Sequence, residues 1–154
     1  MARKHTKGFT LTELLAVIAI LGILVLISIP AMGEWIRRAR VRAATDQLTV
    51  DLRAARYIAV TNRSSTNFNI SIDPLNSYNY TDSNGKAIKI DLPVGVRLVS
   101  TTSTTIVFNQ NGGVNGGSET IVMENQVAGD LVHRYTITVS TIGKISVQFE
   151  SVST

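Results

Sequence analysis

The chain has 154 residues, of which 44% are hydrophobic and 17% charged, so it is the size of one domain and too apolar to be disordered. It contains no cysteine, which excludes disulfide frameworks, thiol nucleophiles and thiolate metal sites. The formal net charge is +4, but residues 1–63 hold ten Lys/Arg against four Asp/Glu, whereas residues 64–154 hold five against seven. The basic character therefore belongs to the first part of the chain.

An uncharged stretch of twenty residues, LLAVIAILGILVLISIPAMG, runs from Leu14 to Gly33. An α-helix of that length spans about 30 Å, the thickness of the hydrocarbon core of a bilayer. A secretory signal peptide would have a shorter apolar region that ends in a small-x-small cleavage site. Three basic residues, Arg3, Lys4 and Lys7, precede the stretch, which predicts a cytoplasmic N-terminus. We therefore expect a membrane anchor with the rest of the chain on the outer side.

An acidic residue, Glu13, stands at the very start of this apolar region. A carboxylate deep in a bilayer costs roughly 2.5–3.5 kcal/mol on insertion scales, so it needs a partner. A glutamate that reaches up to the lipid headgroups is the simpler alternative, but it leaves the residues before Glu13 unexplained. The segment KGFTLTELLAVIAILGILVLISIP resembles the class III signal of type IV pilins and pseudopilins: a short basic leader, glycine, phenylalanine, and glutamate as the fifth residue after the cut.

This resemblance implies a role for four residues. A prepilin peptidase of the inner membrane would cut between Gly8 and Phe9, and the new amine of Phe9 would be N-methylated. Glu13 would then meet the N-terminal amine of a neighbouring subunit during assembly. Pro30, at a position where family members commonly carry proline, would kink the helix, because proline lacks a backbone N–H donor.

Beyond Gly33 the sequence becomes polar but keeps a helical period. Apolar residues recur at spacings of three and four, namely Val41, Ala44, Leu48, Leu52, Ala55 and Ile58. No turn signal separates this amphipathic part from the apolar part. The sequence therefore predicts one helix from about Phe9 to Thr61, whose second half packs on a sheet.

Beyond Asn62 the period changes to two, which is typical of half-buried strands. The alternation runs through TNFNISI, AIKIDL and RYTITVS and closes the chain in ISVQF, with turn signals such as Asp82-Ser83-Asn84-Gly85 between them. About seven short antiparallel strands are expected. The predicted fold class is α+β and pilin-like, with a long N-terminal helix, membrane-spanning in its first half, packed on a small antiparallel β-sheet domain. Its parts are a leader at 1–8, a membrane and assembly helix at 9–33, an amphipathic continuation at 34–62 and a β domain at 63–154.

Three further segments narrow the resemblance. DLRAARYIAV at 51–60, FNQNGG at 108–113 and VSTIGKISV at 139–147 look like the GspH/FimT group of minor pilins and pseudopilins. The group implies a structural subunit rather than an enzyme, inserted in the bacterial inner membrane with its β domain in the periplasm and then built into a fibre or its tip. Its partners would be the prepilin peptidase, other pilin or pseudopilin subunits, an inner-membrane assembly platform and the lipid bilayer. The pattern does not distinguish a type II secretion pseudopilus from a type IV or competence pilus.

The sequence holds little material for catalysis or metal binding. The histidines are His5, in the leader, and His133, which we expect on the surface of a strand. Asp82, Asn84 and Gly85 resemble the start of a calcium loop, but the remaining oxygen ligands are missing, and a tight turn explains them more simply. No metal and no cofactor are predicted.

DNA binding in natural transformation is the alternative function. Some FimT-like pilins carry Gly-Arg-x-Arg in the last hairpin, where this chain has Gly143-Lys144-Ile145-Ser146. Lys144 and Arg134 are the candidate phosphate contacts, but they lie in an acidic half of the chain, which weakens attraction to a polyanion.

Overall fold

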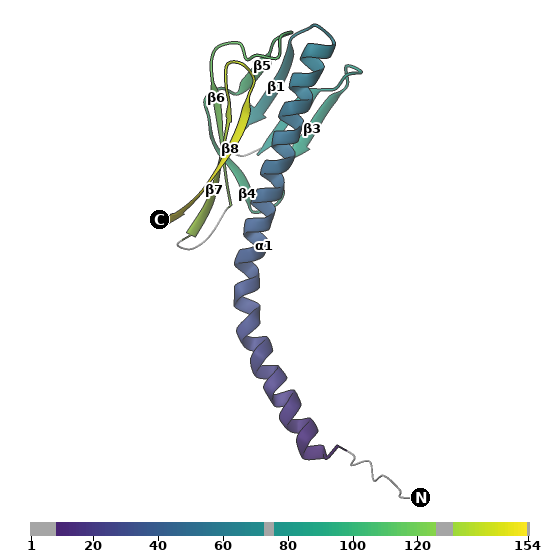
Figure 1. Cartoon of the computed structure of the whole chain (residues 1–154), viewed down its shortest axis with the longest axis vertical. Helices are drawn as coiled ribbons and strands as arrows, with labels where there is room; N and C mark the ends of the chain where they lie inside the picture. Colours follow the sequence, from purple (N-terminus) through teal and green to yellow (C-terminus); the bar gives the residue numbers. More distant parts are fainter. Residues whose placement is uncertain (1–8, 73–75, 126–130, 154) are drawn as a thin grey trace, which may run out of the picture. The chain divides into compact units, whose positions relative to one another are not determined.

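The computed structural model describes residues 9–72, 76–125 and 131–153, without the side chains of residues 26–32, 131 and 153 (Figure 1). The predicted leader, including Gly8, lies outside these ranges. The chain divides into two compact units, Met1–Ile36 and Arg37–Thr154. The helix α1, Leu11–Thr61, runs through both units, and the strands all belong to the second.

The helix α1 ends at the predicted residue and begins two residues after the predicted one. At its C-terminus, the amide of Ser64 donates to the carbonyl of Ala59 at 3.1 Å, and Arg63 has a left-handed φ of 48°, as in a Schellman cap. Within the part of the chain whose residues are described, no helix is both long and apolar enough to cross a membrane. The predicted span includes residues 26–32, so the side chain of Pro30 lies outside the description, although its backbone belongs to α1.

The described residues form eight strands, one more than expected, in two antiparallel four-stranded sheets. One sheet has the order β3-β2-β1-β5 and the other the order β4-β6-β7-β8. The strands are β1 (Thr66–Ser71), β2 (Ser77–Thr81), β3 (Ala87–Asp91), β4 (Val96–Thr101), β5 (Thr105–Phe108), β6 (Glu119–Asn125), β7 (Leu131–Val139) and β8 (Ile145–Ser153). The predicted α+β class, with a long helix and antiparallel strands, is confirmed.

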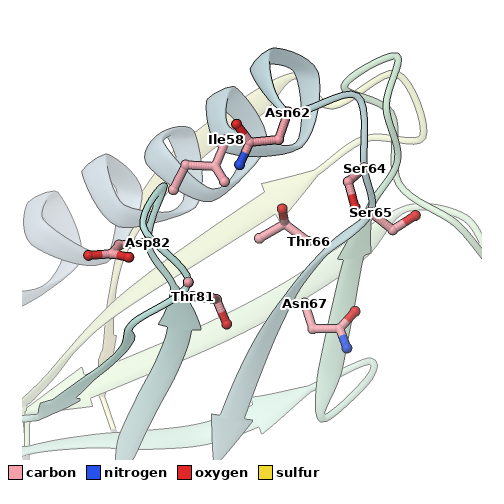
Figure 2. Close-up of a pocket in the computed structure, with 9 residues that line it drawn as sticks. Ile58, Asn62, Ser64, Ser65, Thr66, Asn67, Thr81 and Asp82 are labelled. Carbon is pink, nitrogen blue, oxygen red and sulfur yellow. The ribbon is translucent and has the colours of Figure 1, made fainter.

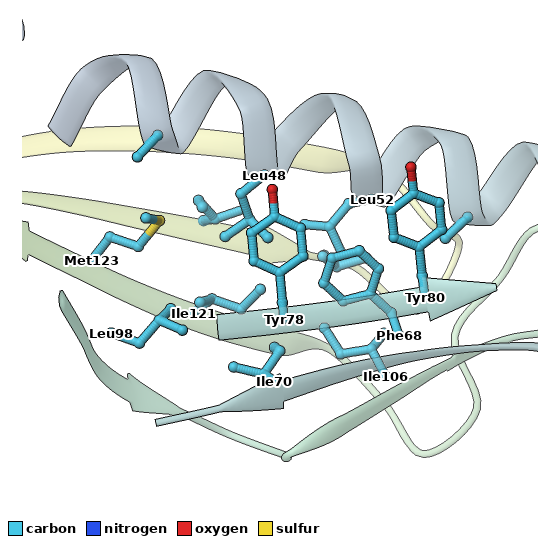
Figure 3. Packing of buried hydrophobic residues seen from close by; sticks show 14 of the residues in the cluster. Leu48, Leu52, Phe68, Ile70, Tyr78, Tyr80, Leu98, Ile106, Ile121 and Met123 are labelled. Carbon is cyan, nitrogen blue, oxygen red and sulfur yellow. The ribbon is translucent and has the colours of Figure 1, made fainter. Parts of the chain in front are cut away.

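The core of the second unit lies between α1 and the two sheets (Figure 3). The predicted apolar stripe is buried from Val41 to Ala55, while Ile58 is half-buried and Ala59 completes the stripe. Phe68 stacks on Tyr78 and Tyr80, with ring centroids 5.3 and 5.7 Å apart. Each large apolar side chain that is fully buried contributes about 1.5–3 kcal/mol, so this stripe holds the second half of α1 on the sheets.

A buried carboxylate joins α1 to the first sheet. Asp51 accepts hydrogen bonds from the hydroxyls of Tyr78, at 2.6 Å, and Tyr80, at 3.2 Å, and from the side-chain amide of Gln47. Figure 3 shows both tyrosine hydroxyls pointing toward α1. Burial, and then the contact with Asp51, raises the pKa of both tyrosines above the ordinary value. Because these bonds are directional, they fix the position of α1 along β2 in a way that apolar packing alone does not.

Three glycines bring the loop after β5, the turn after β7 and α1 together. The Nε of Arg56 donates to the carbonyl of Gly112 at 2.8 Å, and the amide of Val114 donates to the carbonyl of Thr141 at 2.9 Å. A Cβ on Gly143 would overlap the carbonyl oxygen of Gly112, and a Cβ on Gly113 would lie 2.8 Å from that of Thr141. Only glycine therefore allows this approach of the backbones.

Candidate functional site

Glu13 is held by the residue three positions before it. The amide and the hydroxyl of Thr10 donate to the Oε2 of Glu13 at 3.1 and 3.2 Å, and the amide of Glu13 donates to the Oγ1 of Thr10 at 3.3 Å. This is a capping box, in which Thr10 is the N-cap and Glu13 is the third helical residue. It explains why α1 begins at Leu11 rather than at Phe9. The Thr-x-x-Glu spacing is visible in the sequence and would have predicted it.

The helix around Glu13 exposes its apolar side chains on every side. From Phe9, which is 82% exposed, to Val25, the large hydrophobic residues of the first unit are exposed. An uninterrupted apolar surface of this extent is not stable in water, so it calls for lipid or for other apolar helices around it. Glu13 is the acidic residue in the first turn of this surface.

The structure separates the two candidate DNA contacts. Arg134 is paired with Glu124, with its Nε 2.6 Å from the carboxylate, and lies in β7 opposite Glu150. Lys144 is exposed beside the opposite end of that strand, next to the pairing of Val139 with Ile145. Five strand residues between them correspond to about 17 Å. The sequence did not reveal that the charge of Arg134 is neutralised by its neighbour.

Glu124 lies in a row of alternating charge across the second sheet. Arg97, Glu124, Arg134 and Glu150 face one another in register on four neighbouring strands. Glu124 is only 3% exposed, and Arg97 lies 3.6 Å from its second oxygen. Opposite charges directly across strands stabilise a sheet, so this row supports the sheet rather than forming a phosphate site.

The prediction that His133 lies on the surface is wrong. His133 is 3% exposed, its ring lies 5.9 Å from that of Phe149, and its amide donates to the Oδ1 of Asn125 at 2.6 Å. The physical reason is the strand period: His133 shares a face of β7 with the buried Tyr135 and Ile137. The alternation that identified the strand also placed His133 inside.

The Asp82 segment forms the predicted tight turn. The Oδ1 of Asp82 accepts from the amides of Asn84 and Lys86, both at 2.8 Å, and Gly85 has a left-handed φ of 80°. Among the residues that the structure describes, no three His, Asp or Glu side chains gather where they could hold a metal ion.

A polar hollow of about 270 Å³ lies between the end of α1 and this turn (Figure 2). Figure 2 shows Ile58 and Asn62 on α1, Asp82 beyond β2, and Thr66 and Asn67 on the entry to β1. Its remaining lining residues are Ser64, Ser65, Thr81 and Gly85. Hydroxyl groups and the Asp82 carboxylate line it, so the hollow offers hydrogen bonds, and one oxygen of Asp82 already accepts from the amides of Asn84 and Lys86.

Comparisons with known proteins agree with the predicted N-terminal signal and with the predicted pilin-like fold. Residues 3–29 match the family described as the prokaryotic N-terminal methylation motif. The chain is 58% identical over 38 residues to a fimbrial protein of Moraxella nonliquefaciens, and the match covers 25% of each protein. The chain thus spans about a quarter of the length of the curated relative that it matches.

Two solved structures share the fold. The type IV minor pilin FimU of Pseudomonas aeruginosa has a TM-score of 0.57 at 17% identity, over 72% of this chain and 90% of that one. The minor pseudopilin EpsH from the type 2 secretion system of Vibrio cholerae has a TM-score of 0.55 at 10% identity, over 71% of this chain and 96% of that one. At these identities the likeness shows the fold.

Proposed function

We propose that this chain, which joins a prepilin-type methylation motif to the fold of minor pilins and pseudopilins, is a structural subunit of a type IV pilus or a type II secretion pseudopilus. That combination is the observation that carries the proposal. Pilins and pseudopilins are structural subunits, so the chain is assigned no catalytic residue. Its work is assembly, through contacts with other subunits.

Processing takes place at the N-terminus. In the proposal, the prepilin peptidase cuts after Gly8, which removes the basic residues of the leader and leaves Phe9 as the methylated N-terminus. The motif match at 3–29 supports this assignment because it spans the proposed cut and continues well into α1. A cut ahead of the apolar helix, unlike that of a secretory signal peptide, retains the helix in the mature subunit.

The exposed apolar surface gives residues 9–33 two successive environments. In the inner membrane, lipid covers this surface, with the N-terminus in the cytoplasm and residues 63–154 in the periplasm; in the fibre, helices of other subunits replace the lipid. The assembly platform carries out the transfer. Pro30 lies at the far end of this segment and lets the helix bend where the amphipathic part, residues 34–62, begins.

Glu13 selects the correct position of a subunit as it enters the fibre. A carboxylate and an N-terminal amine that pair within an apolar surrounding each remove the cost of the other's unpaired charge. A subunit out of register would leave both charges unpaired. Because of this penalty, the pairing favours one stagger between neighbouring helices.

DNA uptake has weaker support than assembly. Arg134 already binds Glu124, so Lys144 is left as the exposed member of the proposed pair. The test is the affinity of the full chain in detergent for duplex DNA at rising salt, in the wild type and in Lys144→Ala. Affinity that falls steeply with salt and is lost in the variant supports this role, and no binding at low salt removes it.

The proposed function is tested in a strain that lacks this gene, by quantitative proteomics of sheared surface fibres and of the culture supernatant. Loss of the major pilin from the sheared fraction would make the chain a minor pilin that initiates or stabilises pili. Retained pili with specific exported proteins missing from the supernatant would make it a secretion pseudopilin. A proteome unchanged in both fractions would contradict the proposal.

A further inference from the structure

The two sheets have four edge strands, and three of them resist pairing with another chain. The strand β3 has an exposed ion pair, Lys89 with Asp91 at 2.8 Å, and charged side chains discourage addition of a strand. The strand β4 contains a register shift between Leu98 and Ser100, which distorts its edge. The strand β5 is only four residues long.

The fourth edge, β8, has no ion pair between its own residues and no register shift, it is not short, and Glu150 is its one charged residue. It has nine residues and pairs with β7 along its whole length without a register shift. Its sequence, ISVQFESVS, contains no lysine, arginine or proline. Among the described residues, no backbone hydrogen bond reaches the side of β8 that faces away from β7, and no residue from Ile145 to Val152 is buried. Figure 1 shows β8 (yellow) beside β7.

The core face of the sheet continues onto β8 without a cover. Val147 lies opposite the buried Ile137, and Phe149 lies opposite the buried Tyr135, so both point to the core side. Nevertheless Val147 is 40% exposed and Phe149 43% exposed. A row of free backbone groups beside half-exposed apolar side chains is the arrangement that accepts an added strand.

A cation borders this apolar pair. The guanidinium of Arg38 lies 4.9 Å from the centre of the Phe149 ring, and Arg42, one turn further along α1, has a side chain that is 73% exposed. Arg42 reaches Asp46 only at 3.9 Å, between two exposed side chains, which is a weak pairing. Charge complementarity therefore favours a partner with an acidic side chain near Arg38.

The direction of β8 decides between a second copy and a different subunit. Gly143 lies against Arg56 and Phe149 against Arg38, so β8 runs opposite to α1. Antiparallel pairing of two β8 strands would reverse one α1, whereas subunits of one membrane or fibre keep their helices in the same direction. Parallel pairing about a twofold axis would place the two apolar pairs on opposite faces of the sheet. The direction of the helices therefore excludes the first arrangement, and the second leaves the two apolar pairs apart.

We infer that the free edge of β8 receives an extended strand of a different pilin-type subunit, antiparallel to β8. An apolar side chain of that strand covers Val147 and Phe149, and an acidic one lies within reach of Arg38. The inference rests on the proposed function, because it takes the partner from the same fibre. It adds an interface in the β domain to the one made by the N-terminal helices.

Photo-crosslinking in cells that assemble fibres tests this interface. A benzoylphenylalanine is placed in the full chain at Ser146, Gln148 or Glu150, in three separate variants, and the crosslinked peptides are identified by mass spectrometry. Antiparallel pairing predicts contacts on one strand of a pilin-type subunit that move backward along its sequence as the probe moves forward along β8. Contacts that move forward, that fall on a helix, or that belong to a protein outside the pilin class would overturn the inference.

Matched variants test whether the adducts depend on the edge of β8 or only on the exposure of the probe. The same probe at Ala87 tests the edge of β3, which is also exposed and keeps its Lys89–Asp91 ion pair, and it should give about tenfold fewer adducts, since charged edges resist pairing. Val147→Lys should reduce the adducts from Gln148 about tenfold, whereas Val99→Lys, at an equally exposed valine in β4, should leave them unchanged. Equal adducts from both edges, or equal effects of both lysines, contradict the inference.

The sheared fibres from the same cells distinguish the two proposals. If the chain is found in the fibres but the probes in β8 give no adducts, the inference that β8 receives a strand is wrong and the proposed function stands. If the chain is absent from fibres in every strain that assembles them, the proposed function fails and the inference fails with it.

Discussion

The amide and the hydroxyl of Thr10 both donate to one oxygen of the Glu13 carboxylate, at 3.1 and 3.2 Å. In the single subunit, Glu13 is therefore hydrogen-bonded within its own first turn. An amine from a neighbouring subunit would exchange with these bonds or add to them, rather than meet a bare carboxylate. This lowers the cost of holding Glu13 in an apolar region before assembly.

Two substitutions at Glu13 separate capping from charge. Glu13→Val removes both, whereas Glu13→Gln keeps a side-chain oxygen for the capping box and removes the charge. We expect both variants to insert in the membrane and both to enter sheared fibres at least tenfold less than the wild type, because breaking a buried ion pair costs about 3–5 kcal/mol. Cell fractionation and immunoblots of the fibres measure this. Normal incorporation of the Gln variant would mean that Glu13 supplies a helix cap and not a charge.

Processing should depend on the residue before the cut. Gly8→Ile places a bulky side chain at the proposed cleavage site, so we expect the leader to remain attached, as measured by the intact mass of the membrane-bound chain. Gly22→Ala is the control, since a Cβ there meets nothing within 4 Å and alanine favours a helix. Removal of the leader from the Gly8 variant at the normal rate refutes this cut site.

The long helix and its buried stripe could be predicted because period and position are local properties of the sequence. Val41, Leu48 and Leu52 recur at helical spacing, and a face of that kind has to be buried. The motif at Gly8, Phe9 and Glu13 was recognisable for a similar reason, since its residues are neighbours in the chain. Its roles in cleavage and assembly remain predictions.

The features that the sequence did not predict depend on contacts between residues far apart in the chain. Nothing near Arg134 in the sequence shows that Glu124, on the next strand, neutralises it. The same holds for Asp51, whose tyrosine partners lie 27 and 29 residues further along the chain. His133 is a different case, because the alternation of β7 was sufficient to place it inside.

The Tyr78 hydroxyl should stabilise the second unit. Tyr78→Phe leaves the buried Asp51 with one donor fewer, so we expect a loss of about 1–3 kcal/mol in the free energy of unfolding. Urea denaturation of the full chain in detergent measures it. Tyr57→Phe is the control, at a tyrosine that is 70% exposed, and it should change little. Equal effects of the two variants would show that the bond to Asp51 contributes nothing.

The raised pKa of Tyr78 also predicts how stability depends on pH. The unfolded chain loses the phenolic proton near pH 10, whereas the folded chain retains it, so this contribution is complete below about pH 10 and declines above it. Wild-type stability should therefore fall above pH 10 more steeply than that of Tyr78→Phe. Parallel declines, measured by urea denaturation between pH 8 and 11, contradict this assignment.

Alanine substitutions at two glycines with similar backbone conformations distinguish the cost of a left-handed φ from the cost of a steric clash. Gly143 has φ +77° and Gly85 has φ +80°, but only Gly143 faces a backbone, at the carbonyl of Gly112. Gly85→Ala should cost about 1 kcal/mol, the penalty of a left-handed residue. Gly143→Ala should cost clearly more and release the β7–β8 turn, detected as faster amide hydrogen exchange at Val114, which donates to Thr141. Equal melting temperatures of the two variants would show that the close approach of Gly143 to the carbonyl of Gly112 is not required.

The turn from Asp82 to Gly85 offers a place to label the subunit. The amides of Asn84 and Lys86 donate back to Asp82 within the turn, and a Cβ on Gly85 would meet nothing within 4 Å. Because the chain has no cysteine, Ser83→Cys would provide a single thiol for a fluorescent dye. The dye would stand on a turn away from β8, so the entry of single subunits into a growing fibre could be followed by light microscopy in living cells.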